Sequence, residues 1–256
     1  MRTFRKADPA APDGFFACEA AGLRWLADAA SGARCAQVIG YDSSGLTLEF
    51  VTSAPPDPTP AREFGARLAQ THNAGAGGFG APPAGWSGPG FFGPLQQPLP
   101  MSYGHHAGWG SFYATERLRP MLEEARPRLD RVTCTDLENV ISRCCTGDFD
   151  VDDIPARLHG DLWSGNLLWT ARDVVLIDPA AHGGHRETDL AMLALFGCPH
   201  LGAVLEGYQE VNPLRPGWRE RTVLHQLYPL LAHVVLFGGG YASQTARAAR
   251  ACVNLV

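Results

Sequence analysis

The chain has 256 residues and a mass of 27.5 kDa, enough for one large domain or two small lobes with a buried core. Hydrophobic residues make up 45% of the chain and charged residues 18%, a balance that excludes an extended disordered protein. The 26 acidic and 21 basic side chains give a net charge of −5, which excludes a globally basic nucleic-acid binder. We therefore expect a globular protein with no nucleic-acid partner.

Cysteine usage and apolar patterning indicate the compartment. The seven cysteines are an odd number without a C-x-x-C pair, so a secreted disulfide framework is not expected. Residues 1–14 carry charges but no apolar stretch of signal-peptide length. The longest apolar run, 227–242, is interrupted by Pro229 and His233 and falls short of the roughly 20 residues of a membrane span. We expect a cytoplasmic protein with reduced thiols and no membrane partner.

The first fifty residues read as a small α/β unit. Residues 3–6 indicate a strand end, and apolar residues at three-to-four spacing predict an amphipathic helix over about 15–30. Two strands, 36–41 and 46–51, are expected to follow, joined by a turn at 42–45.

A stiff connector follows this unit. Residues 52–60 contain four prolines in nine positions, which excludes regular structure and marks a lobe boundary. The predicted domains are a small N-terminal lobe at 1–52, a hinge or connector at 53–60, and a helical C-terminal lobe at 61–256.

The C-terminal lobe is expected to be mostly helical. Helices are predicted at 61–74, near 109–126, at 133–145 and from 218 to the end. A stretch dense in Gly and Pro, 75–108, and a strand-loop-strand insert, 157–178, separate them. Residues 75–80 satisfy G-x-G-x-x-G literally, but they follow a helix and open none, so we interpret them as a loop.

Three residues of the insert have the spacing of a phosphoryl-transfer site. Asp161 in HGDLWSGN is followed five positions later by Asn166 and twelve beyond that by Asp178, which ends the apolar run 174–177. One carboxylate would orient the attacking hydroxyl, while the amide oxygen and the second carboxylate would hold Mg²⁺ against nucleotide phosphates. The alternative is structural: two residues that cap turns and one that ends a strand.

These motifs resemble the fructosamine kinase (ketosamine 3-kinase) family. The resemblance rests on HGDLWSGNLLW, IDPAAHGGHRETDLAML and LYPLLAHVVLFGGGY, and it extends back to GWSGPGFFGPLQQP and WGSFYATERLRP. It implies an α+β, protein kinase-like fold similar to that of aminoglycoside phosphotransferases. In that fold a small β-rich N-terminal lobe and a larger, mostly helical C-terminal lobe hold ATP between them.

The resemblance also implies roles for individual residues. Asp161 would be the catalytic base, Asn166 and Asp178 the metal ligands, and Trp163 a residue that faces the sugar. Lys6 resembles the strand lysine that contacts the nucleotide phosphates, and Glu19 resembles its ion-pair partner on the following helix. The alternatives are a solvated lysine near the terminus and an exposed helix carboxylate.

For the residues expected at the hinge and near the acceptor, a binding role and a purely structural role both stay open. Glu49 and Val51 would offer backbone groups to adenine, although a plain edge strand would look the same. His185, Arg186 and Glu187 follow the metal Asp and would meet the substrate, or else lie in a solvated loop. His233 would be a core histidine or a substrate neighbour. Asp189 opens a helix and is expected to cap it or brace the catalytic loop, and His105 and His106 show no zinc-ligand spacing.

The predicted function is ATP-dependent phosphorylation of a sugar hydroxyl of ketosamines, the fructosamine and ribulosamine adducts of glycation, whether small molecules or bound to protein. Phosphorylation destabilises such adducts, so the implied role is deglycation. Two alternatives stay open: a phosphotransferase for another hydroxylated small molecule, such as an aminoglycoside or amino alcohol, and a nucleotide-binding pseudokinase. The family has aromatic character after the Asp-Pro pair, whereas this sequence has Ala180-Ala181-His182 there. The identity of the acceptor therefore stays open.

One expected feature of the fold is a glycine-containing hairpin over the ATP phosphates. The sequence begins five residues before Lys6, which leaves no room for that hairpin. Residues 3–6 would then form an edge strand without neighbours, and the phosphates would lack a lid of backbone donors. We expect weak ATP binding, and a true start roughly 30 residues upstream, the length of a two-strand hairpin and its loop. The rival is a natural truncation.

Overall fold

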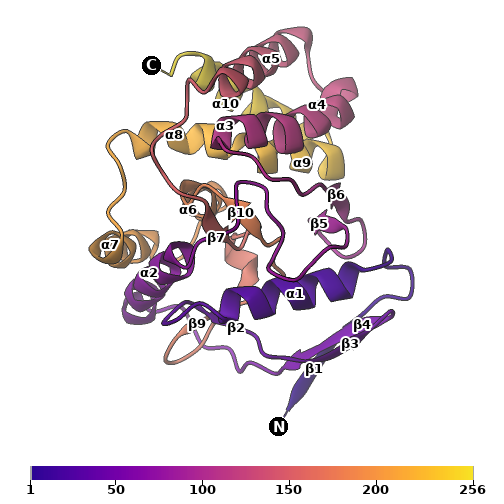
Figure 1. Ribbon diagram of the computed structural model, residues 1–256, viewed down its shortest axis with the longest axis vertical. Coiled ribbons are helices and arrows are strands. Elements are labelled where there is room, and N and C mark those ends of the chain that lie inside the picture. The colour runs from indigo at the N-terminus through magenta and orange to yellow at the C-terminus, as the bar shows by residue number, and fades with distance from the viewer. Residues whose placement is uncertain (1, 256) are drawn as a thin grey trace.

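The computed structural model describes residues 2–255. Its N-terminal part is a three-stranded antiparallel sheet with one helix on its inner face, at the bottom of Figure 1. These elements are β1 (Thr3–Ala7), β3 (Val38–Asp42), β4 (Gly45–Glu49) and α1 (Phe15–Ala27). The strand order is β1-β4-β3, so β1 is paired along its whole length with β4 rather than lacking neighbours.

Local chemistry explains the hairpin between β3 and β4. The Asp42 carboxylate accepts a hydrogen bond from the Ser44 backbone N–H at 2.8 Å, an Asx-type turn that reverses the chain. Leu46 and Leu48 alternate along β4 and are buried toward α1. Two residues, 43 and 44, connect the strands, two fewer than in the predicted turn at 42–45.

A second, smaller sheet joins the N-terminal part to the rest of the chain. β2 (Arg34–Cys35) pairs in parallel with β9 (Val174–Leu176), which pairs antiparallel with β8 (Leu167–Trp169). The Ala36 N–H continues this pairing by donating to the Leu176 carbonyl at 2.9 Å. β2 was not predicted, because two residues are too few for a periodic signal.

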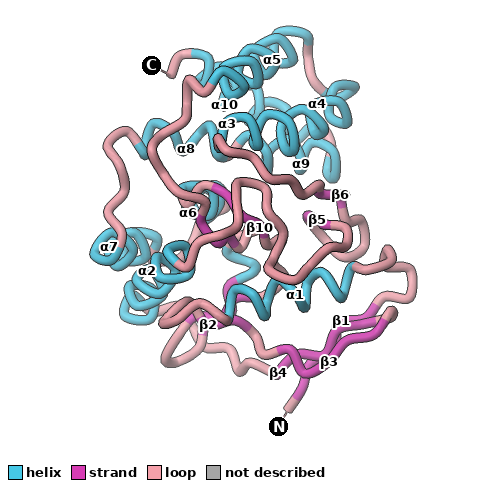
Figure 2. The backbone as a smooth tube through the Cα atoms, in the orientation of Figure 1, coloured by secondary structure: helices cyan, strands magenta, loops and turns pink. Residues whose placement is uncertain are grey.

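The C-terminal part is mostly helical, as expected, and its helices surround a short central hairpin (Figure 2). The helices are α2 (Pro58–Asn73), α3 (Trp109–Phe112), α4 (Arg119–Ala125), α5 (Arg131–Thr146), α6 (Glu187–Leu195), α7 (Leu201–Val211), α8 (Trp218–His225), α9 (Leu227–Phe237) and α10 (Ala242–Val253). The central hairpin pairs β7 (Ala156–Leu158) with β10 (His182–Gly184), which brings the two ends of the predicted catalytic insert together.

Helices α2 and α7 pack unusually closely. A Cβ on Gly65 would collide with the Val204 carbonyl, and one on Gly207 would collide with the Arg62 carbonyl. Both glycines are needed because the two backbones approach one another directly. This contact carries the α2 residue His72 toward the catalytic insert, where it takes part in the site described below.

Two helix boundaries and the stretch 75–108 also differ from the prediction. α1 ends at Ala27 rather than near 30. α2 begins at Pro58 rather than at 61, because the Asp57 carboxylate accepts from the Thr59 N–H and prolines are tolerated in a first helical turn. The Gly- and Pro-rich stretch 75–108 contains a hairpin of β5 (Gly90–Phe92) and β6 (Leu99–Met101). The domain division at 53–60 stays a prediction.

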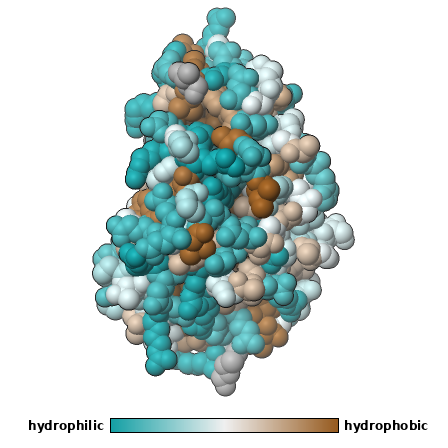
Figure 3. All heavy atoms as spheres, turned by 60° about the vertical axis from the view of Figure 1, so that its left-hand side comes forward, coloured by the Kyte–Doolittle hydropathy of each residue, from teal (hydrophilic) through white to brown (hydrophobic). Residues whose placement is uncertain are grey.

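Within residues 2–255, no helix combines the length and the apolar character that a membrane crossing needs. On the face shown in Figure 3, hydrophobic residues are scattered among hydrophilic ones and do not form one continuous patch.

Candidate active site

A pocket of about 800 Å³ lies among the N-terminal sheet, the stretch 159–166 and α9. Its walls carry most of the residues predicted for the nucleotide, the catalytic centre and the acceptor. They are Lys6, Glu49, Val51, Asp161, Asn166, Asp178, Trp163 and His233. Glu19 lines a small recess that shares Lys6, Asp161 and Asp178 with this pocket. The stretch 159–166 is called the catalytic loop below.

The catalytic loop is held by a buried carboxylate beneath it. Asp189 accepts from the His159 N–H at 2.8 Å and from the Gly160 N–H at 2.9 Å. His72 on α2 holds the same carboxylate at 3.2 Å and bonds to the Tyr208 hydroxyl at 2.7 Å. Asp189 therefore braces the loop, which was one of its two predicted roles. The loop is rigid because its first two amides are fixed by a fully buried group.

Backbone geometry aims Asp161 and Asn166 at the pocket. Gly160 has φ +82°, and a Cβ there would collide with the Ala180 carbonyl, so only glycine fits before Asp161. The Asn166 amide nitrogen donates to the Asp161 carbonyl oxygen at 2.8 Å and to its carboxylate at 3.2 Å. These bonds close the loop and fix the Asp161 side chain at the pocket wall.

Asp161 has the titration behaviour of a proton acceptor at neutral pH. Burial raises its pKa to about 7, and the negative charges of Asp178 and Asp189 act in the same direction, while the Asn166 hydrogen bond opposes them. A base with a pKa near the working pH combines the ionised form with enough basicity to accept a proton. The group is thus suited to orient and deprotonate a hydroxyl that enters the pocket.

Lys6, Glu19 and Asp178 form an ion-paired cluster at the inner end of the pocket. The Lys6 ammonium lies 2.8 Å from the Glu19 carboxylate and 3.1 Å from that of Asp178. Burial alone would lower the pKa of Lys6, but the two carboxylates outweigh it and raise the pKa, so the ammonium stays charged. Lys6 is therefore not a solvated terminal lysine, and Glu19 is not an exposed helix carboxylate.

The donor set beside Lys6 fits a hard divalent cation. Asn166 uses its amide nitrogen for the loop, and in the described part of the chain no protein donor reaches its amide oxygen. Asp178 also lines the pocket, and its backbone has φ +54°, a left-handed conformation that costs energy outside glycine. One amide oxygen and one carboxylate, with room for phosphates, match the ligands of Mg²⁺ in nucleotide sites.

The segment after β4 offers the Val51 N–H to a nucleotide base. The Glu49 N–H donates to the Gln37 carbonyl at 2.9 Å, and the Phe50 N–H donates to the Arg2 carbonyl at 3.0 Å. Among residues 2–255 the Val51 N–H has no hydrogen-bond acceptor, and Val51 lines the pocket. Val51 therefore fits the predicted hinge contact, whereas the N–H of Glu49 is already used.

Aromatic rings form the opposite, outer wall of the pocket. The His233 ring lies 4.6 Å from Phe196, 5.3 Å from Phe237 and 4.9 Å from Tyr241, measured between ring centroids. Trp163 extends this wall at 6.3 Å from Phe196. Burial lowers the pKa of His233, so its ring is neutral at pH 7. We call these five residues the aromatic wall.

Sequence reasoning named only two members of the aromatic wall. Phe196, Phe237 and Tyr241 were missed, although one signal was present. His233, Phe237 and Tyr241 recur every four residues, the spacing of neighbours on one side of a helix, although α9 itself ends at Phe237.

Comparison with known proteins identifies the family. The Fructosamine kinase family model matches residues 1–254. The chain belongs to the fructosamine kinase family. A probable ketoamine kinase from Synechocystis is 34% identical over 94% of this chain and 79% of its own length. A crystal structure described as a putative fructosamine-3-kinase from Thermobifida fusca is 45% identical, with a TM-score of 0.90 over 99% of this chain and 86% of that one.

A more distant likeness bears on the fold alone. A thermostable aminoglycoside phosphotransferase, solved as a ternary complex with ADP and hygromycin B, is 14% identical and superposes with a TM-score of 0.61. The match covers 98% of this chain and 85% of that one. The predicted protein kinase-like α+β fold is confirmed.

The GHRE stretch of this fructosamine kinase family member does not reach the pocket. His185, Arg186 and Glu187 are buried in the C-terminal part, behind the central hairpin. The imidazole of His185 and the guanidinium of Arg186 each lie 3.2 Å from the carboxylate of Asp153. The structure thus gives no geometric support to a substrate contact for these three residues, and they do not form a solvated loop either.

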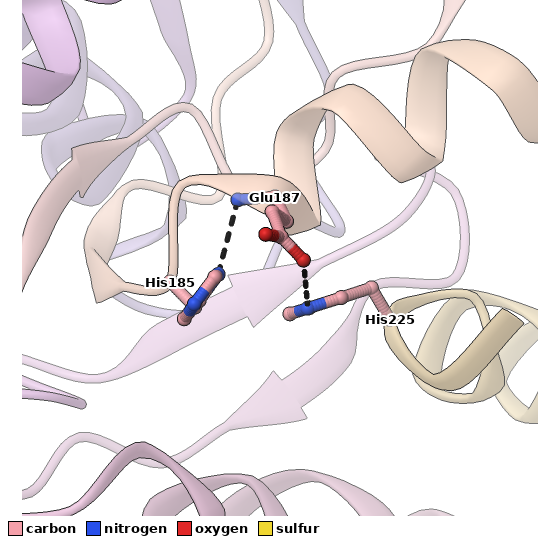
Figure 4. A group of neighbouring side chains, drawn as sticks. All are labelled: His185, Glu187 and His225. Carbon is pink, nitrogen blue, oxygen red and sulfur yellow. Dashed lines mark hydrogen bonds and ion pairs between the residues drawn. The ribbon is translucent and has the colours of Figure 1, made fainter. Parts of the chain in front are cut away.

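Glu187 and two histidines form the centre of that buried network, drawn in Figure 4. Their potential ligand atoms lie within 4.8 Å of one another. However, Glu187 pairs with Arg221 at 2.7 Å, and the Nδ1 atom of His185 accepts from the Glu187 N–H at 3.2 Å. His225 shares its Nδ1 atom with Thr188 at 2.9 Å. A divalent cation would have to displace these partners next to the Arg221 charge, so we interpret the cluster as structural.

Proposed function

We propose that this protein transfers the γ-phosphoryl group of ATP to a sugar hydroxyl of ketosamines. The observation that carries the proposal is the position of Asp161. Its carboxylate, with a pKa near 7, lies between a cationic and metal-binding end of the pocket and an aromatic wall. A phosphate donor and a hydroxyl acceptor bound at these two ends would meet at Asp161.

The nucleotide end is divided among three groups. The Val51 N–H donates to the adenine base at the hinge. Lys6, held by Glu19, places its ammonium against the phosphates, where it stabilises the charge that spreads over the transferred group. Asn166 and Asp178 would hold Mg²⁺, which supplies further charge neutralisation and orientation for the phosphates when bound.

The acceptor end uses the aromatic wall. A sugar presents apolar C–H faces that pack against aromatic rings, and Trp163 lies closest along the chain to Asp161. Asp161 accepts the proton of the hydroxyl that attacks, with the Asn166 amide holding its carboxylate in place. Trp163 and Phe237 stay 40% and 59% exposed, which leaves the outer end of the wall open to a larger carrier of the sugar. We therefore include protein-bound ketosamines among the acceptors.

The proposed compartment is the cytoplasm. All seven cysteines are free thiols, and all but Cys145 are buried, which suits a reducing environment. Phosphorylation of ketosamines in that compartment would serve deglycation of metabolites or proteins.

An acceptor screen tests the proposal. The wild-type protein is incubated with ATP and Mg²⁺, and ADP release is measured with a fructosamine, a ribulosamine, an aminoglycoside, an amino alcohol and no acceptor. We expect release that depends on the two ketosamines and exceeds the acceptor-free rate at least tenfold. Release with the aminoglycoside or amino alcohol alone would assign a different acceptor, and no release with any acceptor in a protein that binds ATP would indicate a pseudokinase.

A further inference from the structure

Arg34 joins three parts of the chain through one side chain. Its Nη2 atom donates to both carboxylate oxygens of Glu49, at 3.1 and 3.0 Å. Its Nη1 atom lies 3.4 and 3.2 Å from the two oxygens of Asp173. Arg34 itself lies on β2, which follows α1. Its planar guanidinium therefore forms a fork between the end of β4 and the turn that precedes β9.

Each partner of Arg34 lies within a few residues, along the chain, of one end of the proposed nucleotide site. Glu49 ends β4 and lies two residues before the Val51 N–H, the proposed adenine contact. Asp173 lies immediately before β9, the strand that runs to the metal-site residue Asp178. The Asp173 carboxylate also accepts from the Thr170 hydroxyl at 2.5 Å, so the turn itself is fixed. The fork thus connects the adenine end to the metal end outside the pocket.

We propose that Arg34 is a positioning residue that sets the distance between the hinge and the metal-binding end of the nucleotide site. Backbone contacts also join these parts of the chain: two residues of β2 pair with β9, the Ala36 N–H donates to the Leu176 carbonyl, and the Ala54 N–H donates to the Trp169 carbonyl. The fork adds a side-chain connection to these backbone contacts, because one guanidinium nitrogen donates to both oxygens of Glu49 and the other donates to both oxygens of Asp173. The inference rests on the proposed nucleotide site, and the experiment below separates the two.

The test uses a ligand that spans both ends and two fragments that do not. Binding of Mg²⁺-ATP, of adenosine, and of inorganic tripolyphosphate with Mg²⁺ is measured by calorimetry or competition, without acceptor, for wild type and Arg34→Gln. We expect Arg34→Gln to weaken Mg²⁺-ATP binding about fivefold, because the Arg34 side chain is 39% exposed and water screens its ion pairs. The two fragments should change less than about twofold, since each touches one end only.

A matched variant controls for the general loss of an ion pair. Arg62 on α2 pairs with Glu206 and Glu210 on α7, is about half exposed and does not line the pocket. Arg62→Gln should leave ATP binding unchanged. Asp173→Asn should weaken ATP binding as Arg34→Gln does, and the double variant should add little more, because both changes cut the same connection. Arg34→Lys should recover little, since an ammonium lacks the fork.

The outcomes separate the possible failures. A wild-type protein that binds no Mg²⁺-ATP would overturn the proposed nucleotide site itself. Wild-type binding with an unaffected Arg34→Gln would overturn the positioning role alone. An equal loss for adenosine and ATP would show that Arg34 supports only the hinge, and an equal loss in Arg62→Gln would show a general loss of stability. Either result also contradicts a role in spacing.

Discussion

Two clusters of charged and polar side chains have opposite relations to the pocket. Lys6, Glu19, Asp161 and Asp178 line cavities. The cluster around Glu187, in contrast, is closed, because its histidines and arginines take up every oxygen of its two carboxylates. Both clusters lie in segments that resemble the same family, so motif membership alone does not separate them.

The two clusters differ in whether positively charged groups offset the effect of burial on the pKa of the carboxylate. For Glu187, burial alone would raise the pKa, but His225 and Arg221 outweigh it and hold the pKa at about 2. For Asp161, burial is not compensated by any cation in direct contact, and the pKa rises to about 7. A carboxylate fully paired inside the protein stabilises the fold, whereas one left unpaired beside a cavity is available for chemistry at a cost in stability.

The largest effect is expected from Asp161→Asn. The amide cannot accept a proton, so kcat should fall by roughly 10²- to 10⁴-fold, the usual contribution of a general base. ATP affinity and the circular dichroism spectrum should stay close to those of wild type, because the side chain faces the acceptor. Steady-state kinetics with a ketosamine checks this prediction, and a kcat near that of wild type would remove Asp161 from the mechanism.

Asp178→Ala tests the other side of the catalytic cluster. Loss of the carboxylate should abolish the Mg²⁺-dependent increment in ATP affinity and most of the turnover. Calorimetry of ATP binding with Mg²⁺ and with EDTA measures that increment, and the EDTA values for the two proteins serve as the internal control. If the increment persisted in the variant, Asp178 would be only a residue at the end of a strand.

Glu187→Gln should disrupt the closed cluster and lower stability without a large change in kcat. The amide leaves Arg221 buried without its ionic partner, which should lower the free energy of unfolding by about 3 kcal/mol. Per folded molecule, kcat should change by less than about twofold, because Glu187 lies outside the pocket. Urea denaturation and kinetics below the transition measure the two quantities. Glu123→Gln, which removes an exposed partner of Arg126, is the control and should shift stability by less than about 0.5 kcal/mol.

A large loss of kcat in fully folded Glu187→Gln would contradict the comparison. It would mean that the buried network acts on the site and does not only stabilise the fold.

The smallest effect concerns pH. Since Asp161 must be ionised to act as a base, kcat/KM should rise with pH through about 7.

The raised pKa of Asp161 also means that the folded state binds a proton that the unfolded state releases above pH 3.8. This group therefore contributes stability at low pH that is lost as pH rises to about 7. Asp161→Asn should melt above wild type at pH 8, with a difference that shrinks toward pH 4. A constant difference in Tm across this range would contradict the raised pKa.

The grouping of the proposed catalytic residues around one pocket was predictable because their spacing is short and local. Asp161, Asn166 and Asp178 lie within eighteen residues on one strand-loop-strand insert, so the chain itself brings them together. Lys6 and Glu19 were also predictable, since α1 follows β1 directly and packs beneath the same sheet. The aromatic pair of Trp163 and His233 depended on the resemblance.

The features that the sequence did not predict depend on contacts between segments far apart in the chain. The pairing of β2 with β9 joins residues about 140 positions apart through only two residues, which produces no periodic pattern. The GHRE stretch looked available to substrate because its partners, Asp153 and Arg221, lie on other segments and carry no motif. Whether a charged residue faces a cavity or a counter-charge is decided by tertiary packing.

The most direct test is ³¹P NMR of a reaction between ATP, Mg²⁺ and a fructosamine, run with wild type and with Asp161→Asn. We predict that wild type converts the γ-phosphate signal of ATP into a new phosphomonoester signal coupled to a proton of the sugar. Asp161→Asn should give almost none of it in the same time. Conversion of ATP only to ADP and inorganic phosphate, or equal phosphomonoester formation by both proteins, would contradict a ketosamine kinase in which Asp161 activates the acceptor.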